Sequence, residues 1–393
     1  MLFERRLREL SYSARMAFTI AVNTGGGDAP GLNAAIRAVA ISAHRRGWRV
    51  LGIRHGYRGL IESKADGVVT LDRNTVRGIT HLGGTILGSA NRGDPFRFPM
   101  MTAGKLVPTD VSELMIRRMK ELKVDALVAI GGDGSIRLAE KLLERGMPRV
   151  VAIPKTIDND LPGTDVTFGF DTAVDTATDA IGKLHTTAQA HERVMVVEVM
   201  GRYAGWIALH AGIAGGADVV LIPEIPFDIN RVCEKILDRE ARGRHFSIVV
   251  VAEGARPAGG EMVFKAEAGQ FKEHGQLGGI AELVAARIHT ETGKETRSLV
   301  LGHLQRGGSP VMTDRVLALR LGCGATRFVA EYEDSGMVAV RSGKLEFVPL
   351  QEATNGLRTV TPDSTSLQTA RDLGLCFGDE PEGSFRTSLP PTA

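Results

Sequence analysis

The chain has few cysteines, little excess charge and no long apolar run. Its 393 residues carry a formal net charge of +2, which gives no sign of binding to nucleic acid or to a membrane surface. The three cysteines, Cys233, Cys323 and Cys376, are widely spaced and form neither a disulfide framework nor a metal site, so we expect a cytoplasmic protein. No apolar run reaches the roughly 18 residues that would cross a bilayer.

Length and the two chain ends indicate how the chain is organised. Its 393 residues exceed the size at which one hydrophobic core usually stays undivided, so we expect two lobes. Residues 1–16 are too polar for a signal peptide and predict an N-terminal extension, or a true start at Met16. Residues 356–393 are polar, with Pro and Ser gathered toward the end, and predict a disordered tail.

One stretch, residues 124–160, organises the rest. Residues 124–130 are apolar and predict a buried parallel strand. A glycine loop, GGDGS, follows at residues 131–135, and residues 136–145 predict a helix. A strand, a glycine loop and a helix in this order offer backbone N–H groups and a helix N-terminus to a phosphate.

A second predicted strand, residues 150–153, leads into the segment PKTIDND at residues 154–160. We expect this segment to bring Lys155, Asp158 and Asp160 to the same sheet edge as Asp133, which is the edge where open α/β folds bind ligands. Phosphoryl transfer needs anion donors, a metal carboxylate and a base for the incoming hydroxyl. This edge can supply all three.

Two more glycine-rich loops support a phosphate ligand. Residues 25–31 follow a predicted strand at 18–22 and precede a predicted helix at 32–44. Residues 83–92 close on Arg92, which we interpret as an anion ligand because a guanidinium matches phosphate oxygens in two places. A tight turn without a ligand would explain one such loop, but the presence of three favours phosphate.

Strands and helices alternate along the whole chain, which predicts parallel sheets in a three-layer αβα sandwich. Further predicted strands are residues 48–53, 194–199, 218–222, 247–251 and 299–301, and further predicted helices are residues 171–191 and 278–290. Residues 93–106 predict a surface loop. Glu198 lies inside a predicted strand, where burial without a partner would be costly, so an ion pair and a functional role are equally open.

A second group of cationic and polar side chains lies near the predicted strand at residues 299–301. It contains Arg297, His303, Gln305 and Arg306, followed by two glycines at 307 and 308. A lone histidine is more often structural, but this cluster favours a second anion pocket, separate from the glycine loops.

These segments resemble the successive signature segments of the 6-phosphofructokinases. They are GGGDAPGLN, GGTILGSANR, GGDGS, PKTIDND, RVMVVEVMGRYAG and ETGKETRSLVLGHLQRGG. The resemblance implies phosphoryl transfer from ATP, with Mg²⁺, to the 1-hydroxyl of fructose 6-phosphate. It implies that residues 17–168, rejoined by about 305–355, bind nucleotide and Mg²⁺ and that residues 169–304 bind the sugar phosphate. It also implies a homotetramer.

The resemblance further implies a role for each matching residue. Asp158 would take the proton of the attacking hydroxyl, Asp133 would bind Mg²⁺, and Arg92 would balance charge on the transferred group. Other residues implied in catalysis are Thr156, Asp160, Gly134 and Lys155. Those implied in donor binding are Gly27, Arg92, Gly93, Gly132, Asp133, Gly134 and Ser135. Those implied in sugar-phosphate binding are Thr156, Ile157, Asp158, Met200, Gly201, Arg202, Glu253, His303, Leu304, Gln305 and Arg306, with Arg193 and Arg297 supplied by a neighbouring subunit.

The phosphoryl donor depends on two positions. In the family that the chain resembles, glycine after the GGD triplet accompanies ATP and aspartate accompanies pyrophosphate, because a carboxylate there would occupy the space of the nucleotide α-phosphate and repel it. Gly134 therefore favours ATP. Lys155 and the segment GRYAGW resemble the pyrophosphate-dependent branch, so pyrophosphate is the alternative donor.

Effector control and two other function classes complete the predictions. Arg37 matches the effector-site pattern of the familiar bacterial enzymes, but Ile41 replaces the second arginine, so we expect a weak response to ADP and phosphoenolpyruvate. A non-catalytic sugar-phosphate sensor would be expected to lose Asp133 or Asp158, and both are present. A dinucleotide oxidoreductase would need G-x-G-x-x-G followed by an acidic residue about 20 positions later, a pattern that the glycine loops lack.

Overall fold

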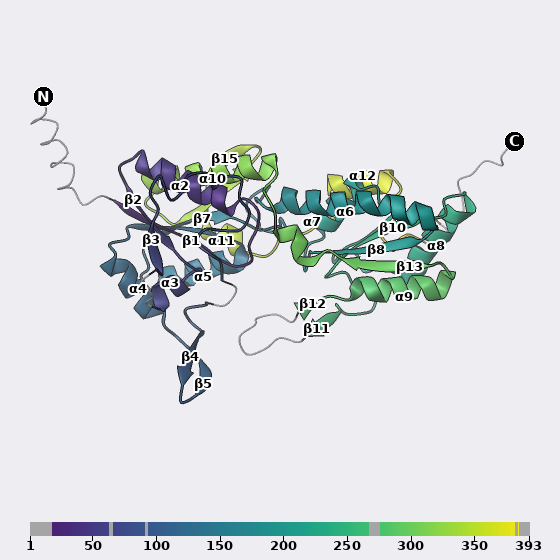
Figure 1. Ribbon diagram of the computed structural model, residues 1–393, viewed down its shortest axis with the longest axis horizontal. Coiled ribbons are helices and arrows are strands. Elements are labelled where there is room, and N and C mark those ends of the chain that lie inside the picture. Colours follow the sequence, from purple (N-terminus) through teal and green to yellow (C-terminus); the bar gives the residue numbers. More distant parts are fainter. Residues whose placement is uncertain (1–17, 63–65, 91–92, 267–275, 382–383, 385–393) are drawn as a thin grey trace, which may run out of the picture. The chain divides into compact units, whose positions relative to one another are not determined.

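The computed structural model describes residues 18–62, 66–90, 93–266, 276–381 and 384, which form two compact units (Figure 1). The first unit contains the described residues of Met1–Lys155, Leu161–Phe168 and Gly308–Asn355. The second contains Thr156–Asp160 and the described residues of Gly169–Gly307 and Gly356–Ala393. By its contacts, Thr156–Asp160 therefore belongs to the second unit, whereas the sequence placed it in the nucleotide lobe. The predicted extension, residues 1–16, lies outside the described residues.

The first unit is built on a seven-stranded sheet with the order β15-β14-β7-β6-β1-β2-β3. Its central strands are parallel, and β3 and β15 are added antiparallel at the two edges. The strands are β1 (Thr19–Thr24), β2 (Arg49–Ile53), β3 (Val68–Thr70), β6 (Ala126–Gly131), β7 (Arg149–Pro154), β14 (Gly336–Arg341) and β15 (Lys344–Pro349).

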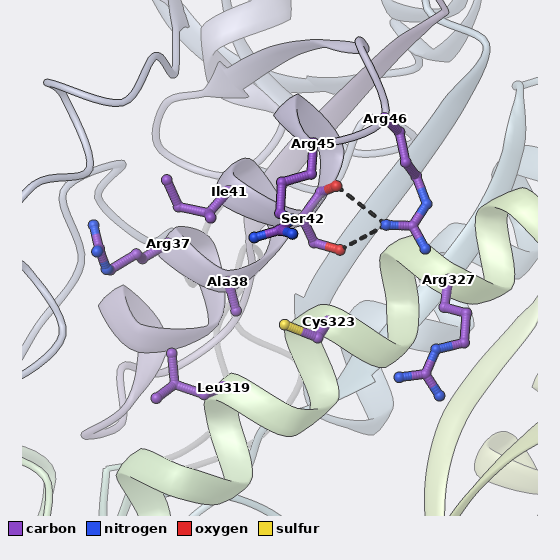
Figure 2. A pocket seen from close by; sticks show the side chains of 9 residues that line it. All are labelled: Arg37, Ala38, Ile41, Ser42, Arg45, Arg46, Leu319, Cys323 and Arg327. Carbon is purple, nitrogen blue, oxygen red and sulfur yellow. Dashed lines mark hydrogen bonds between the residues drawn. The ribbon is translucent and has the colours of Figure 1, made fainter.

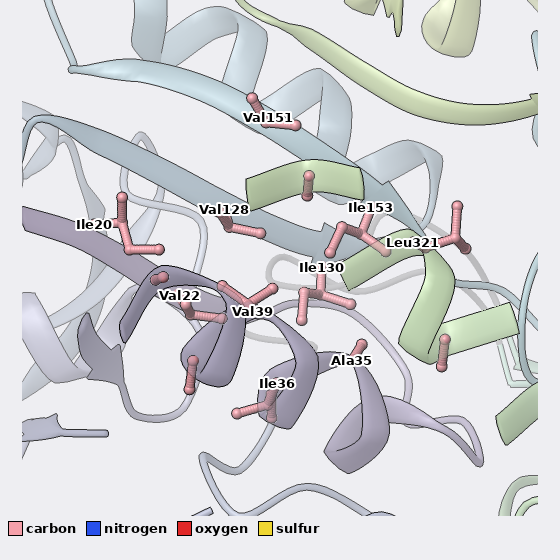
Figure 3. Close-up of a cluster of buried hydrophobic side chains, with 14 of the residues drawn as sticks. Ile20, Val22, Ala35, Ile36, Val39, Val128, Ile130, Val151, Ile153 and Leu321 are labelled. Carbon is pink, nitrogen blue, oxygen red and sulfur yellow. The ribbon is translucent and has the colours of Figure 1, made fainter. Parts of the chain in front are cut away.

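Helices cover both faces of this sheet. Helices α2 (Leu32–His44) and α10 (Met312–Glu331) pack on one face, against alternate side chains of β1, β6 and β7 (Figure 3). Helices α3 (Arg58–Ile61), α4 (Ser112–Glu121) and α5 (Asp133–Glu144) pack on the other, with α11 (Leu350–Thr354) beside α5. The central strands are buried on both faces, as helix-covered parallel sheets require. The predicted three-layer α/β fold is confirmed.

Strand order defines where a ligand can bind to this unit. From β1 the chain passes to β2 on one side, and it later returns through β6 to the other side of β1. The helices that follow β1 and β6, α2 and α5, cover opposite faces. Open α/β sheets bind ligands in the crevice that forms at such a topological switch point, beyond the carboxyl ends of the strands.

The second unit has a smaller parallel sheet with the order β13-β8-β10-β9. Helices α6 (Phe170–His191) and α7 (Trp206–Ala214) lie on one face, and α8 (Ile229–Ala241) and α9 (Ile280–Thr292) lie on the other. The strands are β8 (Val194–Val199), β9 (Val219–Leu221), β10 (Ser247–Ala252) and β13 (Thr296–Val300). The remaining elements are β11 (Phe264–Ala266), β12 (Gln276–Leu277), the 3₁₀ helix η1 (Gly302–Arg306) and α12 (Thr365–Asp372). No described helix of either unit is both long and apolar enough to span a bilayer.

The surface loop predicted for residues 93–106 is wrong in its second half. Strands β4 (Phe98–Thr102) and β5 (Lys105–Thr109) form an antiparallel hairpin. Its turn places Ala103 at φ 48° and Gly104 at φ 79°. Two consecutive residues with positive φ form the tight connection that matches the twist of a hairpin, and the Ala-Gly pair is a weak sequence signal for it.

The disordered tail predicted from residue 356 is also wrong for the part that the structure describes. Residues 365–372 form α12, which packs on α7. Cys376 forms a parallel bridge with Val219 at the edge of the sheet, and Phe377 is fully buried. A few apolar residues in a polar segment are enough to fix it when a sheet edge and a helix face are available to receive them.

Candidate active site

The loop GGDGS contributes the N-terminus of a helix rather than a free loop. The sequence placed the helix start at residue 136, but α5 begins at Asp133, with Gly132 as its N-cap. The first turn is closed by a hydrogen bond from Ile136 N to Gly132 O at 3.1 Å. The N–H groups of the first helical turn have no partner within the helix, so Asp133, Gly134 and Ser135 can present theirs to an anion.

The glycines near this helix start have different reasons to be glycine. A Cβ at Gly25 would lie 2.6 Å from Ser135 Oγ, and a Cβ at Gly131 would lie 2.3 Å from Ser135 Cβ. Glycine is therefore needed at position 131, where β6 turns into α5, while at Gly25 the nearest atom is the rotatable hydroxyl of Ser135 and the Cβ of Ser135 lies 3.2 Å away. A Cβ at Gly134 would meet nothing within 4 Å, and Gly134 has no positive φ. Neither packing nor backbone geometry within the described part of the chain requires glycine at position 134.

Lys155 ties two of the predicted segments together. Because β1, β6 and β7 are parallel neighbours, with Thr24 beside Ile130 and Gly131 beside Pro154, the segments that follow them begin at one edge of the sheet. Lys155 is only 3% exposed, and its Nζ donates a hydrogen bond to the carbonyl oxygen of Gly27. Of the residues predicted to reach this edge beside Asp133, Lys155 lies there, whereas the contacts of Asp158 and Asp160 assign them to the second unit.

The third glycine-rich loop, residues 83–90, is held against the start of α2. The buried Asn33 donates from Nδ2 to the carbonyl oxygen of Gly83 at 3.0 Å and accepts from Ile86 N at 2.8 Å. Ser89 Oγ donates to the carbonyl oxygen of Gly26, which joins this loop to the first glycine loop. Gly93 lies just beyond, against Arg58. Arg92, the predicted anion ligand, lies outside the described residues.

Asp133 fits the part of a magnesium ligand. Its side chain is 43% exposed, and its carboxylate lies 3.6 Å from Arg137, one turn along α5. No group of three His, Cys, Asp or Glu residues among the described ones could hold a metal alone. Mg²⁺ usually takes one or two protein carboxylates and completes its shell with waters and phosphate oxygens, so a single accessible carboxylate beside phosphate-binding N–H groups fits this ion.

In the second unit, the loop Thr156–Asp160 is stabilised by hydrogen bonds of its own side chains. Thr156 Oγ1 donates to Asp160 Oδ1 at 3.1 Å and accepts from Asp158 N at 3.0 Å. The side chain of Ile157 is fully buried. Asp158 and Asp160, in contrast, are partly exposed. This loop can therefore offer two carboxylates to a ligand, whereas Ile157 can hold the loop but not contact a ligand with its side chain.

Three adjacent strands of the second unit end in the predicted sugar-phosphate residues. Met200, Gly201 and Arg202 follow β8, Glu253 follows β10, and η1 follows β13. Close backbone contact makes two glycines necessary here, because a Cβ at Gly254 would lie 1.9 Å from the carbonyl oxygen of Arg202 and a Cβ at Gly201 would lie 2.7 Å from that of Ala204. His303 and Leu304 are exposed, and Arg306 is partly exposed. His303, Gln305 and Arg306 of the predicted second anion cluster therefore lie at this sheet edge, whereas Arg297 lies near the start of β13, at the other end of that strand.

Glu253 and Gln305 differ in what they can do at this edge. Burial raises the pKa of the Glu253 carboxyl above its usual range, while Arg202 and Arg306 act in the opposite direction. These two arginines thus compensate a half-buried carboxylate and remain close to it. Gln305 is 0% exposed, donates to Gly302 O at 3.1 Å and accepts from Met200 N at 3.3 Å. Its side chain positions the loops after β8 and β13 and is not accessible to a ligand in this structure.

Glu198 is held by backbone hydrogen bonds, partners that the sequence did not suggest. Its Oε2 accepts backbone hydrogen bonds from Gly279 N at 3.2 Å and Ala281 N at 3.1 Å, at the start of α9. A carboxylate at this position satisfies N–H groups that the helix leaves unpaired and interacts favourably with the helix dipole. Glu198 is therefore a buried cap of α9, supplied by a neighbouring strand.

Arg193 and Arg297 share one carboxylate. Glu295 lies 2.9 Å from Arg193 Nη2 and 2.6 Å from Arg297 Nη2. The hydrogen bond from Arg193 holds the pKa of Glu295 below its usual range, and the charge of Arg297 adds to the effect. Both arginines lie near β13, an edge strand, and the side chain of Arg297 is 57% exposed. The structure thus brings together the two arginines that the sequence assigned to a neighbouring subunit.

Comparison with known proteins decides the family. The family model described as Phosphofructokinase matches residues 19–329. The chain belongs to the phosphofructokinase family.

Its relatives within this family differ in the donor that their names state. The chain is 51% identical to the ATP-dependent 6-phosphofructokinase of Chloroflexus aurantiacus, over 92% of this chain and 98% of that protein. It is 48% identical to the pyrophosphate--fructose 6-phosphate 1-phosphotransferase of Streptomyces coelicolor, over 91% and 99%. Among solved structures, it resembles T-state phosphofructokinase from Pichia pastoris with a TM-score of 0.74 and 31% identity, over 91% of this chain and 36% of that longer one.

Several residues that fix the conformation of these loops by hydrogen bonds were not identified from the sequence. Asn33 fixes the third glycine loop, and Glu224 accepts hydrogen bonds from Gly205 N and Val360 N at the start of α7. Asn33 lies within the segment GGGDAPGLN, so its place beside two glycine loops was the available signal. Glu224 had no such signal, because its partners are distant in sequence: Gly205 lies 19 residues earlier and Val360 lies 136 residues later.

The predicted effector residues line a separate pocket of about 370 Å³ on α2 and α10 (Figure 2). Arg37 donates to the carbonyl oxygen of Val76 at 2.6 Å, and Ile41 occupies the position where the effector-site pattern has its second arginine. The lining residues are Arg37, Ala38, Ile41, Ser42, Arg45, Arg46, Leu319, Cys323 and Arg327. The weak response to ADP and phosphoenolpyruvate stays a prediction.

Proposed function

We propose that this chain transfers the terminal phosphoryl group of ATP to the 1-hydroxyl of fructose 6-phosphate and yields fructose 1,6-bisphosphate, a reaction of glycolysis. The observation that carries the proposal is the edge of the first sheet. There, two glycine segments and Lys155 meet beside Asp133, at a topological switch point, in a chain that matches the family model over residues 19–329. The names of relatives at 51% and 46% identity state the same activity with ATP.

The residues take complementary roles in this proposal. The first unit binds the donor through Gly27, Gly93, Gly132, Gly134 and Ser135, with Arg92 balancing charge on the transferred group. The second unit binds the acceptor, and its residues are Thr156, Met200, Gly201, Arg202, Glu253, His303, Leu304 and Arg306. Asp158 takes the proton of the attacking hydroxyl, and Asp160 orients the groups around that hydroxyl. Because the transition state is loose, positioning and charge stabilisation dominate catalysis.

Asp133 would hold Mg²⁺ in this assignment. Bound Mg²⁺ neutralises charge on the donor phosphates and supplies a Lewis acid to the phosphoryl oxygens. The N–H groups at the start of α5 face the same donor, because Asp133 is the first residue of that helix. The ammonium of Lys155 binds the carbonyl oxygen of Gly27 and so fixes the conformation of the loop after β1.

ATP is the donor that the structure around Gly134 favours. Open space surrounds the missing Cβ, so the site could accommodate an aspartate without a clash with its own chain. Glycine is then explained by a ligand that uses this space, and a nucleotide α-phosphate is such a ligand. Pyrophosphate is the second candidate, because the Streptomyces coelicolor relative at 48% identity carries that activity in its name and Lys155 matches that branch.

A homotetramer and a cytoplasmic location belong to the same proposal. Arg193 and Arg297 lie together at the edge strand β13, where they would reach the sugar phosphate of a neighbouring subunit. Three free cysteines, two of them buried, suit a reducing compartment.

The proposal is tested with purified protein, fructose 6-phosphate and Mg²⁺, with either ATP or pyrophosphate as donor. We expect turnover with ATP well above that with pyrophosphate. Turnover with pyrophosphate alone would select the second candidate. No turnover with either donor, together with retained fructose 6-phosphate binding, would instead indicate a sugar-phosphate sensor. Size-exclusion chromatography with light scattering measures the oligomeric state, and a monomer with full activity would contradict the shared site.

A further inference from the structure

Arg358 lies in the segment between α11 and α12 and contacts the loop that carries Asp158. Its Nη1 donates to the carbonyl oxygen of Asn159 at 2.9 Å. Its backbone N–H donates to the carbonyl oxygen of Asp160 at 2.8 Å. One residue therefore binds two consecutive carbonyls directly after Asp158, and it does so from about 200 residues further along the chain.

The same arginine is attached to the loop that follows β8. Its guanidinium lies over the ring of Trp206, with Cζ 4.6 Å from the ring centroid, and Trp206 Nε1 donates to the carbonyl oxygen of Arg358 at 3.0 Å. Trp206 is 7% exposed and is the first residue of α7. Two residues on, Val360 N donates to Glu224 at 2.8 Å, and Glu224 also accepts from Gly205 N at 3.0 Å. Residues 358–360 thus connect the loop of Asp158 to the loop of Arg202.

The loop of Asp158 needs such support because of its backbone. Asn159 has φ 51°, in the left-handed region that side-chain-bearing residues seldom adopt, and it is only 5% exposed. Such a conformation persists only where the surroundings over-determine it, and such positions gather at functional sites. The reversed peptide turns the Asn159 carbonyl toward Arg358, and the planar guanidinium, stacked on an indole, is a rigid donor for it.

We propose that Arg358 is a positioning residue for phosphoryl transfer: it fixes loop 156–160, and with it the carboxylate of Asp158, relative to the acceptor-binding loop after β8. The inference rests on the base role of Asp158 proposed above. A catalytic base displaced by about 1 Å can cost about 10²-fold in rate, whereas binding of a ligand with many contacts changes little. Loss of the guanidinium should therefore lower kcat and leave KM for fructose 6-phosphate nearly unchanged.

The test compares Arg358→Met, which removes the guanidinium but keeps the backbone N–H bond, with Arg358→Lys, which keeps a charge and one donor for Asn159. We expect Arg358→Met to lower kcat by about 10- to 100-fold, with KM for fructose 6-phosphate changed less than about threefold. Arg358→Lys should recover part of the loss. Hydrogen exchange measured by mass spectrometry should show faster exchange of peptides that cover residues 156–161 in Arg358→Met.

Arg371→Met is the matched control. Arg371 lies in the same C-terminal segment, but it pairs with Asp379 at 2.6 Å and lies over the ring of Phe377, with Cζ 5.0 Å from the ring centroid, instead of binding loop 156–160. It should lower the melting temperature and leave kcat and exchange at 156–161 unchanged. Unchanged exchange in Arg358→Met, a wild-type kcat, or an equal fall of kcat in Arg371→Met would overturn the inference. An inactive wild-type enzyme would count against the proposed function alone, because the exchange measurement still decides whether Arg358 holds the loop.

Discussion

Lys155 Nζ donates a hydrogen bond to the carbonyl oxygen of Gly27, so the residue after β7 holds the glycine loop after β1. Strand β6 lies between β7 and β1, so this hydrogen bond crosses the topological switch point. Hydrogen bonds to charged groups contribute about 1.5–3 kcal/mol, so we expect Lys155→Met to release the loop and raise KM for ATP by about 10-fold or more. Steady-state kinetics at saturating fructose 6-phosphate measure this change. Lys141→Met, on the exposed side of α5, is the control, and an unchanged KM for ATP in Lys155→Met would show that this hydrogen bond is not needed.

Asp158→Asn removes the proposed base without changing the size of the side chain. A general base contributes about 10²–10⁴-fold, so kcat should fall at least about 10²-fold while fructose 6-phosphate still binds. Calorimetric titration of fructose 6-phosphate provides the binding measurement. Asp175→Asn, an exposed carboxylate on α6, should behave as wild type. Near-normal turnover in Asp158→Asn would remove this residue from the role of base.

Gly134→Asp and Gly131→Ala separate donor choice from folding. Gly134 has open space around its missing Cβ and an early helical position, where a carboxylate is favourable, so Gly134→Asp should fold normally. It should lose ATP-dependent turnover far more than pyrophosphate-dependent turnover. Gly131→Ala would bring a Cβ within 2.3 Å of Ser135, so it should lower the melting temperature and reduce use of both donors together. Equal loss of both donors in Gly134→Asp would mean that this position does not select the donor.

Arg297→Met tests whether the site is shared between subunits. If Arg297 acts on a neighbouring site, the variant should raise KM for fructose 6-phosphate by about 10-fold or more, since it removes a charge-assisted contact to the phosphate. Co-expression with Asp158→Asn then gives hybrid assemblies in which some sites combine an intact Asp158 with an intact Arg297. Their activity should exceed the sum of the two parents. Absence of recovery in hybrids would place Arg297 at the site of its own subunit.

His210 makes folding stability depend on pH. Burial lowers the pKa of His210 below its usual range; Asp171 opposes this shift, and the charge of Arg358 reinforces it. The unfolded chain, with a histidine pKa near about 6.5, then binds more protons than the folded chain, so stability is lost as the pH falls through this value toward the folded pKa. Urea unfolding at a series of pH values should show a steeper decline for wild type than for His210→Gln, by up to about one bound proton. Parallel curves would show that His210 titrates alike in both states.

Local sequence was sufficient for the elements that carry the residues proposed to bind the donor. Apolar runs followed by glycine or polar residues predict β1, β6 and β7, and the segments after all three begin at the same sheet edge because the strands are parallel. The first turn of α5 was missed because Asp133 and Gly134 are weak helix formers, and the dependence of that turn on packing is not visible in a local pattern.

The errors at Glu198 and in the C-terminal segment share a cause, which is that the partner lies far away in the chain. The carboxylate of Glu198 finds backbone N–H groups more than 80 residues later, and Arg358 finds the carbonyl of Asn159 almost 200 residues earlier. Residues 356–381 looked like a tail because their own composition cannot bury a core, and they are ordered only because α7 and the edge strand β9 receive their few apolar side chains.

Sequence by itself determined which chemical groups this protein has: the glycine loops, the carboxylates and the arginines to which the proposed function assigns the donor, the metal, the proton and the sugar phosphate. Those choices are local, because spacing along one segment decides what a strand end can present. Tertiary structure alone decided which of these groups are accessible and which are held in place, since Gln305 and Ile157 are buried, Arg193 and Arg297 converge on Glu295, and Arg358 binds the loop of Asp158. Burial and long-range hydrogen bonds depend on the packing of distant segments, which no short stretch of sequence specifies.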